Sequence, residues 1–206
     1  MAEWWDKGTK IPLNDANFQS IINFYLFNCP CETEKGSTKK GTKAYTKVSK
    51  CATTLRAQGW TGSYLNTLLA SMKHTASGRL AYHTLDNKTD IKLEVNKIEK
   101  SSTLSDIYFE LIAMADRSDM SKTSAIFYYI RNAFAHGSFS VIKDESKTIY
   151  YLESAKDDTV KAEIRLREET LLKWITDVTI SPKMLKVALE QERKQKKNKK
   201  KGGAAA

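Results

Sequence analysis

The chain has 206 residues, of which 41% are hydrophobic and 28% charged, with only nine glycines and three prolines. This composition is typical of a globular protein and excludes a collagen-like or wholly disordered chain. No apolar run approaches the roughly 20 residues of a membrane helix, the first residues lack the pattern of a secretory signal, and three cysteines do not suit a disulfide framework. We therefore expect a soluble, cytoplasmic protein that does not contact a membrane.

The formal net charge of +10 is concentrated near the C-terminus. Removing the seven cations of residues 193–201 from the 34 basic residues leaves 27 against 24 acidic ones, so the rest of the chain is only mildly basic. Such a run can keep a protein soluble or act as a localisation signal. It can also add weak, sequence-independent contacts to RNA phosphates, here through Arg193, Lys194, Lys196, Lys197, Lys199, Lys200 and Lys201.

Helices are expected in the first third of the chain. Asn14 or Asp15 can cap a helix that runs to Asn28 and ends at Cys29-Pro30-Cys31. Residues 32–43 carry no large apolar side chain and are expected to form an exposed loop. Two further helices are expected at 44–58 and 62–77, which end near Gly59 and Gly78.

The middle of the chain predicts two apolar helices. Ser102 or Thr103 begins the first, and its apolar positions include Leu111 and Ile112. Ser121 caps the second, and Gly137 ends it as a residue in the left-handed conformation. Residues 90–100 are ambiguous between a strand and a helix.

After Gly137 the pattern changes to that of strands. Residues 139–142 and 148–152 flank a polar turn, and residues 160–167 alternate between apolar and charged side chains, which predicts a half-buried strand. A helix is expected from Glu168 onward, and Ser181-Pro182 is a typical helix start.

One segment brings three polar side chains to the end of an apolar helix. Asn132 and His136 are four residues apart and therefore share one helix face, and the long side chain of Arg131 can swing toward the same place. A guanidinium grips phosphate oxygens bidentately, and an imidazole moves protons near neutral pH. The spacing is also compatible with a structural role, in which these cations only stabilise the end of the helix.

The string Arg131-Asn132-Ala-Phe-Ala-His136-Gly137 resembles the signature of the HEPN superfamily, and the resemblance is closest over residues 102–137. It implies an all-α homodimeric domain that cleaves RNA without a metal. The ribose 2′-OH attacks the adjacent phosphate and leaves 2′,3′-cyclic phosphate and 5′-OH ends. His136 is then the general acid or base, Arg131 stabilises the charged phosphorane, and Asn132 orients His136 or a phosphate oxygen.

The resemblance also sets the expected organisation and setting. We expect a mainly α protein, with a HEPN-like helical bundle and a small antiparallel β-sheet appendage after the motif helix. Residues 1–60 are then an N-terminal helical extension, 61–190 the HEPN-like domain with its β appendage at 139–167, and 191–206 a basic disordered tail. The family implies a toxin or antiviral defence effector, with an antitoxin or other regulatory protein as partner.

Two alternatives stay open. The first is a noncatalytic HEPN-like module that only dimerises or binds RNA or a protein, and such a scaffold could bury Arg131 or His136 against a carboxylate such as Glu110 or Asp116. The second is a basic RNA-binding chaperone, which would depend on the tail instead of His136.

Metal and cofactor sites find little support in the sequence. Cys29, Cys31, Cys51 and His74 have side chains that can hold zinc, but their spacing fits no standard site. Buried or unpaired thiols are the simpler interpretation. No glycine loop for phosphates is present, and we expect no metal and no cofactor.

Overall fold

The structure is a computed structural model that describes residues 15–31, 54–75, 78, 80–101, 110–144 and 147–202. The expected loop at 32–43, most of the expected helix at 44–58 and the start of the helix expected from Ser102 or Thr103 lie outside the described residues.

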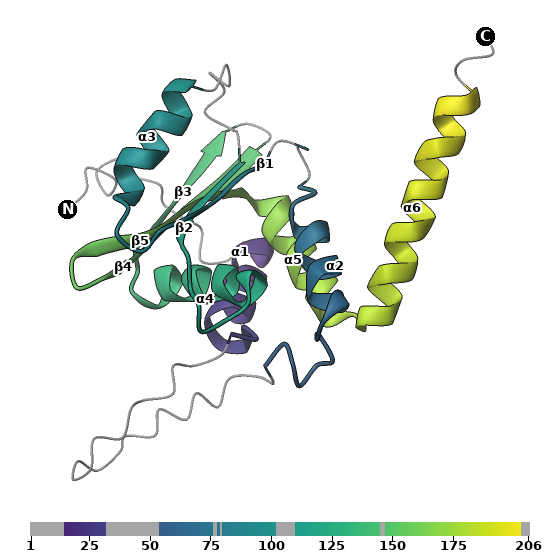
Figure 1. The fold of residues 1–206 in the computed structure, drawn as a ribbon, viewed down its shortest axis with the longest axis horizontal. Helices are drawn as coiled ribbons and strands as arrows, with labels where there is room; N and C mark the ends of the chain where they lie inside the picture. The colour runs from purple at the N-terminus through teal and green to yellow at the C-terminus, as the bar shows by residue number, and fades with distance from the viewer. Residues whose placement is uncertain are drawn as a thin grey trace.

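The strands of the described residues form one five-stranded mixed sheet in the order β1-β2-β5-β4-β3 (Figure 1). β1 runs parallel to β2, and every other neighbouring pair is antiparallel. Parallel strands cannot be joined by a tight turn, and α3 (Ile91–Ser101) lies in the connection between them. The strands are β1 (Leu80–Leu85), β2 (Glu110–Ala115), β3 (Phe139–Asp144), β4 (Lys147–Lys156) and β5 (Thr159–Arg167).

Different helices cover the two faces of this sheet. On one face α3 packs Ile91 and Val95 against Leu111 and Ala113 of β2 (Figure 1). The opposite face carries a larger core, to which the alternate residues of β5 contribute as the pleat of a strand requires. The helices of that core are α1 (Ala16–Ile22), η2 (Asn23–Asn28), α2 (Ser63–Met72), α4 (Lys122–Ala135) and α5 (Glu168–Thr179).

The N-terminal helix forms where the sequence predicts it. The Asp15 carboxylate accepts hydrogen bonds from the backbone N–H groups of Asn17 (2.9 Å) and Phe18 (3.0 Å) and so caps α1. The helix continues as the π-helical η2, in which the buried Tyr25 hydroxyl donates to the carbonyl of Leu171 in α5 (3.0 Å). This segment is therefore tied to a helix more than 140 residues further along the chain.

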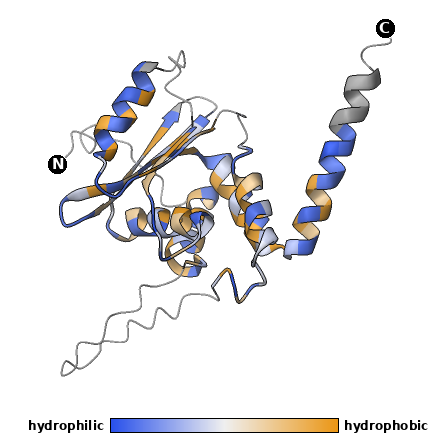
Figure 2. Cartoon of the chain, in the orientation of Figure 1, coloured by the Kyte–Doolittle hydropathy of each residue, from blue (hydrophilic) through white to orange (hydrophobic). Residues whose placement is uncertain are grey.

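The last helix, α6 (Pro182–Gly202), begins where Ser181-Pro182 predicts, and the Ser181 hydroxyl accepts from the N–H of Met184 (3.3 Å). Leu185 is buried against the core, Leu189 is partly buried, and the remainder projects away from the body (Figure 1). Figure 2 shows hydrophobic and hydrophilic residues interleaved near the start of α6, and residues 191–202, which belong to the expected tail, include no apolar side chain. None of the described helices is long and apolar enough to cross a bilayer.

The expected HEPN-like helical bundle with a small antiparallel β-sheet appendage is wrong, because the protein is a mixed α/β structure built on a central sheet. The apolar residues expected in a helix from Ser102 or Thr103 include strand β2, in which all six residues are buried. A strand covered on both faces is a continuous apolar run, which periodicity cannot distinguish from a buried helix. The strands expected after Gly137 are present, but they are β3, β4 and β5 of this same sheet.

The sequence makes no definite prediction for two other segments that form regular elements in the structure. No element is predicted for residues 80–85, which form β1, because all six side chains are half-buried and show no alternation of burial. The ambiguous segment at 90–100 is helical and belongs to α3.

Trp174 of α5 allows a test of the packing between α5 and α2. The side chain is fully buried, and its indole N–H donates to the carbonyl of Met72 at the end of α2 (3.1 Å). We expect Trp174→Ala to lower the free energy of unfolding by about 3–5 kcal/mol. Trp174→Phe keeps much of the apolar volume but leaves the carbonyl unpaired, so we expect a loss of about 1–3 kcal/mol. Denaturant unfolding followed by circular dichroism measures both, and an unchanged Phe variant would contradict the role of the hydrogen bond.

The sheet face under α3 carries a cluster of charged side chains. Glu163 of β5 lies directly opposite Glu153 of β4. Lys92 of α3 forms an ion pair with Glu153 (3.0 Å), and Arg165 forms one with Glu99 (2.6 Å). Burial raises the pKa of Glu163 to about 7; Glu99 and Glu153 add to this rise, while Arg165 and Lys92 oppose it.

This raised pKa predicts a dependence of stability on pH. The folded protein binds the Glu163 proton more tightly than the unfolded chain does, so the contribution to stability is complete below about pH 4.5 and is lost as the pH rises through about 7. We expect Glu163→Gln to raise the free energy of unfolding by about 1–3 kcal/mol at pH 8 and to change it little at pH 4. The exposed Glu190→Gln is the control. If Glu163→Gln changed the free energy of unfolding by the same amount at both pH values, the raised pKa of Glu163 would be contradicted.

Candidate functional site

The motif residues lie on α4, and hydrogen bonds fix the first part of this helix. The Ser121 hydroxyl accepts from the N–H of Ser124 (3.1 Å), which confirms Ser121 as the N-cap. One turn and a half further on, the Tyr129 hydroxyl donates to the carbonyl of Ala115 in β2 (3.2 Å). The buried side of α4 is thereby held against β2, an inner strand of the sheet.

The end of α4 is equally well defined. Gly137 has a φ of +66°, a left-handed conformation that glycine adopts without strain. Its N–H donates to the carbonyl of Phe134 (3.2 Å), and the N–H of Ser138 donates to that of Ala133 (2.9 Å). These two bonds are a Schellman motif, so the predicted end of the helix at Gly137 is confirmed.

An aromatic cluster anchors this end to the sheet and to η2. The ring of Phe134 lies 5.0 Å from that of Phe139 at the start of β3, edge to face. It also lies 6.1 Å from Tyr25 of η2 and 6.3 Å from Tyr150 of β4. Aromatic pairs at these distances add to the energy of burial, so these contacts fix the position of the last turn of α4 relative to the sheet.

With the apolar face buried, the three motif residues remain at least partly exposed at the end of α4. Arg131 and Asn132 are half-buried, and His136, the C-cap residue, is exposed. Within the described part of the chain, none of their side chains forms a hydrogen bond or an ion pair. Asn132 and His136 share a face as the spacing predicts, whereas Arg131 and His136, five positions apart, point about 140° apart around the helix axis.

Neither carboxylate that could have buried these cations does so. Glu110 is buried, and its carboxylate accepts from the backbone N–H of Arg167 (3.1 Å). Asp116 is exposed at the end of β2, where its backbone N–H donates to the carbonyl of Leu85 (2.7 Å). The structural role considered for Arg131 and His136, as cations paired with these groups, is therefore not observed among the described residues.

Two cysteines adjoin the same part of α4, and the sequence did not indicate this. The Cys29 thiol donates to the carbonyl of Phe127 (3.5 Å), one helical turn before Arg131. A hydrogen bond from the Cys29 thiol lowers the pKa of Cys31 to about 7; burial opposes this change, and the positive charge of Arg131 adds to it. The Cys-Pro-Cys string was visible in the sequence, but its proximity to Arg131 depends on how η2 packs on α4.

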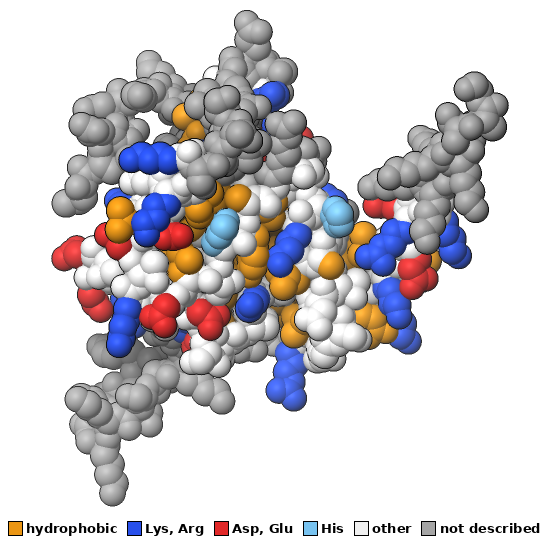
Figure 3. Space-filling model, turned by 45° about the horizontal axis from the view of Figure 1, so that its top comes forward, with side chains coloured by type: hydrophobic (Ala, Val, Ile, Leu, Met, Phe, Trp, Pro, Cys, Tyr) orange, Lys and Arg blue, Asp and Glu red, His pale blue; other side chains and the backbone are white. Residues whose placement is uncertain are grey.

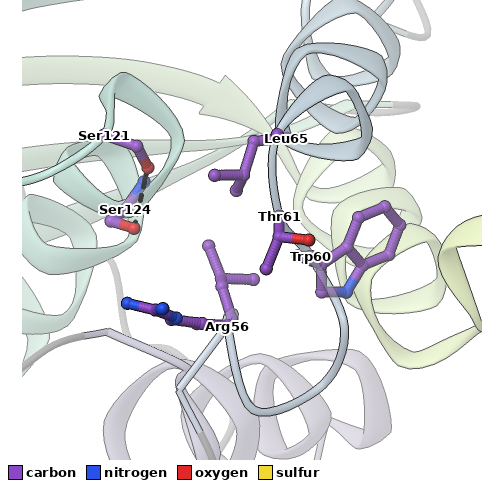
Figure 4. A pocket seen from close by; sticks show the side chains of 8 residues that line it. Arg56, Trp60, Thr61, Leu65, Ser121 and Ser124 are labelled. Atoms are coloured by element: carbon purple, nitrogen blue, oxygen red, sulfur yellow. Dashed lines mark hydrogen bonds between the residues drawn. The ribbon is translucent and has the colours of Figure 1, made fainter.

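A pocket lies at the opposite end of α4. It has a volume of about 270 Å³, and its lining includes Trp60, Ser121 and Ser124. The guanidinium of Arg56 lies on the same side of the opening as the two serines (Figure 4). Both serine hydroxyls already take part in the helix cap, since they lie 2.9 Å apart and bond to each other. Ten residues, or about 15 Å of helix, separate Ser121 from Arg131, so the pocket is not part of the motif site.

The remaining residues that the sequence analysis considered for metal or RNA contact lie apart from the motif. No group of three or more His, Cys, Asp and Glu residues in the described ranges could hold a metal ion, and Cys51 lies outside those ranges. His74 is exposed just after α2. The seven cations of residues 193–201 all lie within α6, and Figure 3 shows lysine and arginine side chains along the described part of this helix.

Comparison with known proteins gives no relative, since no protein-family model, no curated protein and no solved structure matches this chain.

Proposed function

We propose that this protein is a metal-independent endoribonuclease that cleaves RNA by 2′-OH attack and leaves 2′,3′-cyclic phosphate and 5′-OH ends. The supporting observation is that Arg131, Asn132 and His136 lie within the last two turns of a firmly anchored helix, are all at least partly exposed, and form no side-chain hydrogen bond or ion pair with the described residues. Accessible polar groups on a rigid element are free to act on a ligand. The proposal rests on these side chains and their resemblance to the HEPN motif, and not on the overall fold.

Each residue has a distinct chemical role in this reaction. His136 removes the proton of the 2′-OH or protonates the departing 5′ oxygen. Arg131 binds the phosphate and stabilises the negative charge that builds up on it in the transition state. Asn132 shares a helix face with His136 and orients either the imidazole or a phosphate oxygen. None of these steps uses a metal ion.

The angle between Arg131 and His136 favours a site shared by two copies of the chain. Because the two side chains point about 140° apart on one helix, a phosphate bound by Arg131 lies to the side of His136 of the same copy. A two-fold dimer places the same surface of each copy against the other. We infer that Arg131 of one copy works with His136 of the second. The setting of a toxin or antiviral defence effector, with a regulatory protein as partner, belongs to the same proposal.

Cleavage of RNA in EDTA, with the product ends mapped, tests the reaction. We expect Arg131→Ala and His136→Ala each to lower the rate by 10²-fold or more, the size typical of removing an acid–base or transition-state group. Arg56→Ala and His74→Ala are matched controls, since both residues are exposed and lie away from the motif. Cleavage that both motif variants retain, or that stops in EDTA, would contradict the proposal. RNA binding without cleavage, in EDTA and in magnesium, would favour the noncatalytic binding module.

The same two variants test the shared site. If Arg131 and His136 act across the dimer, a mixed dimer of the two inactive variants contains one complete site, and an equal mixture should recover about a quarter of the parent activity. If both residues act within one copy, the mixture stays inactive. Sedimentation of each variant confirms that the dimers form and exchange.

The basic end of α6 predicts how RNA binding depends on salt. Each lysine that neutralises a phosphate of single-stranded RNA adds about 0.7 to the slope of log affinity against log salt. We expect Lys196→Gln, Lys197→Gln and Lys200→Gln together to lower this slope by about 2, as measured by fluorescence anisotropy in a His136→Ala background. The control set is Lys88→Gln, Lys100→Gln and Lys122→Gln, three exposed lysines of the body. An equal change in both sets would assign the effect to net charge alone.

A further inference from the structure

The turn that follows η2 places two thiols in different surroundings next to one arginine. Cys29 is buried, with 1% of its surface exposed, and its thiol donates to the carbonyl of Phe127 (3.5 Å). Cys31 is only partly buried, and both thiols are free. Interaction with the Cys29 thiol lowers the pKa of Cys31, and the positive charge of Arg131 acts in the lowering direction on both thiols.

We propose that Cys29 and Cys31 form a redox-active dithiol site that reacts with low-molecular-weight disulfides such as glutathione disulfide, with Cys31 as the attacking thiolate and Cys29 as the resolving thiol. This site shares Arg131 with the proposed nuclease, but its chemistry can be measured whether or not the protein is a nuclease.

The surroundings of the two sulfurs explain this division of roles. Only a thiolate attacks a disulfide, so the attacking group must lose its proton near neutral pH and be reachable. Hydrogen bonding from Cys29 and the charge of Arg131 both favour the thiolate of Cys31, which also retains some exposure. Burial and the neighbouring Cys31 raise the pKa of the Cys29 thiol, so this group stays protonated and closed to external reagents until a disulfide forms beside it.

The exchange balances in two steps. In the first, the Cys31 sulfur attacks one sulfur of the small disulfide, a Cys31–S–S–R bond forms, and RS⁻ leaves. In the second, the Cys29 thiol gives up its proton to a departing thiolate and attacks the Cys31 sulfur, which releases the other RS⁻. The protein dithiol is oxidised to a disulfide, and one small disulfide is reduced to two thiols.

The spacing of the two cysteines in the chain is compatible with this bond. Residues two apart can be separated by at most about 7 Å between Cα atoms, and disulfides bridge Cα separations of roughly 4.4–6.8 Å. Pro30, between the two cysteines, has a fixed φ, which removes one of the backbone rotations that separate the two sulfurs.

Mass spectrometry after incubation with glutathione disulfide tests the site in a Cys51→Ser background, which removes the third thiol. In the Cys51→Ser protein, we expect the mass of the peptide that contains residues 29–31 to fall by two hydrogens, the change that disulfide formation produces. With Cys29→Ser added, the reaction should stop at a glutathione adduct on Cys31. With Cys31→Ser added, Cys29 should react at least tenfold more slowly. A peptide that stays reduced, or equal reactivity of the two cysteines, would overturn the proposal, and circular dichroism confirms that each variant is folded.

The pH dependence of alkylation by iodoacetamide gives a second measurement that needs no change at either cysteine. We expect the rate at Cys31 in the Cys51→Ser chain to have a midpoint near pH 7. Arg131→Gln should move this midpoint upward toward the usual cysteine value of about 8.5, and Arg56→Gln should leave it unchanged. A midpoint near 8.5 without any change at Arg131 would overturn the proposal.

Discussion

The main core of this structure depends on the burial of one face of α4. The apolar side chains of the helix fill the core against β2, β4 and β5, and a hydrogen bond from Tyr129 to Ala115 fixes the contact. The aromatic cluster around Phe134 and the left-handed Gly137 then fix where the helix stops and where β3 begins. Because one face of α4 is fixed against the sheet, the directions of the side chains on the rest of the helix are fixed as well. This packing has two consequences. It leaves Arg131 and His136 at least partly exposed, and it brings η2 against the same helix.

The sequence predicts local features better than it predicts the sheet. The caps at Asp15, Ser121 and Ser181, the end of α4 at Gly137 and the alternating strand at 160–167 depend on residues close together in the chain, and each is found where expected. The helix expected at 62–77 is shorter, since α2 ends at Met72, and residues 54–58 of the helix expected at 44–58 are not helical. The inner strand β2 is wrongly predicted to be a helix, because its six residues are buried on both faces and show no alternation. β1 has no signal at all. The error in fold class therefore came from two strands whose identity is decided by helices that pack on them from elsewhere in the chain.

The same distinction applies to the site. The spacing of Asn132 and His136 was enough to place them on one face, and their exposure follows from the apolar pattern of α4. The thiols of Cys29 and Cys31 could not be assigned to this neighbourhood, because only the packing of η2 against α4 brings them near Arg131. Arg131 belongs to both proposals. In the proposed dithiol site, the thiolate of Cys31 offsets part of the charge of Arg131, and the proposed oxidation to a disulfide removes that negative charge. In the proposed nuclease, the same guanidinium binds an RNA phosphate.

The projecting helix α6 gives the molecule an uneven distribution of charge. The chain has 34 basic residues, and seven of them lie within nine positions at the far end of α6, a helix about 30 Å long. The rest of the chain carries nearly balanced charge. Such a molecule is an electric dipole, and the field of a polyanion exerts a torque on it before any contact is made. In the proposed binding of RNA, the basic end of α6 turns toward the nucleic acid first and the body follows. Such encounters begin from a limited set of orientations, and dissolved salt weakens that preference.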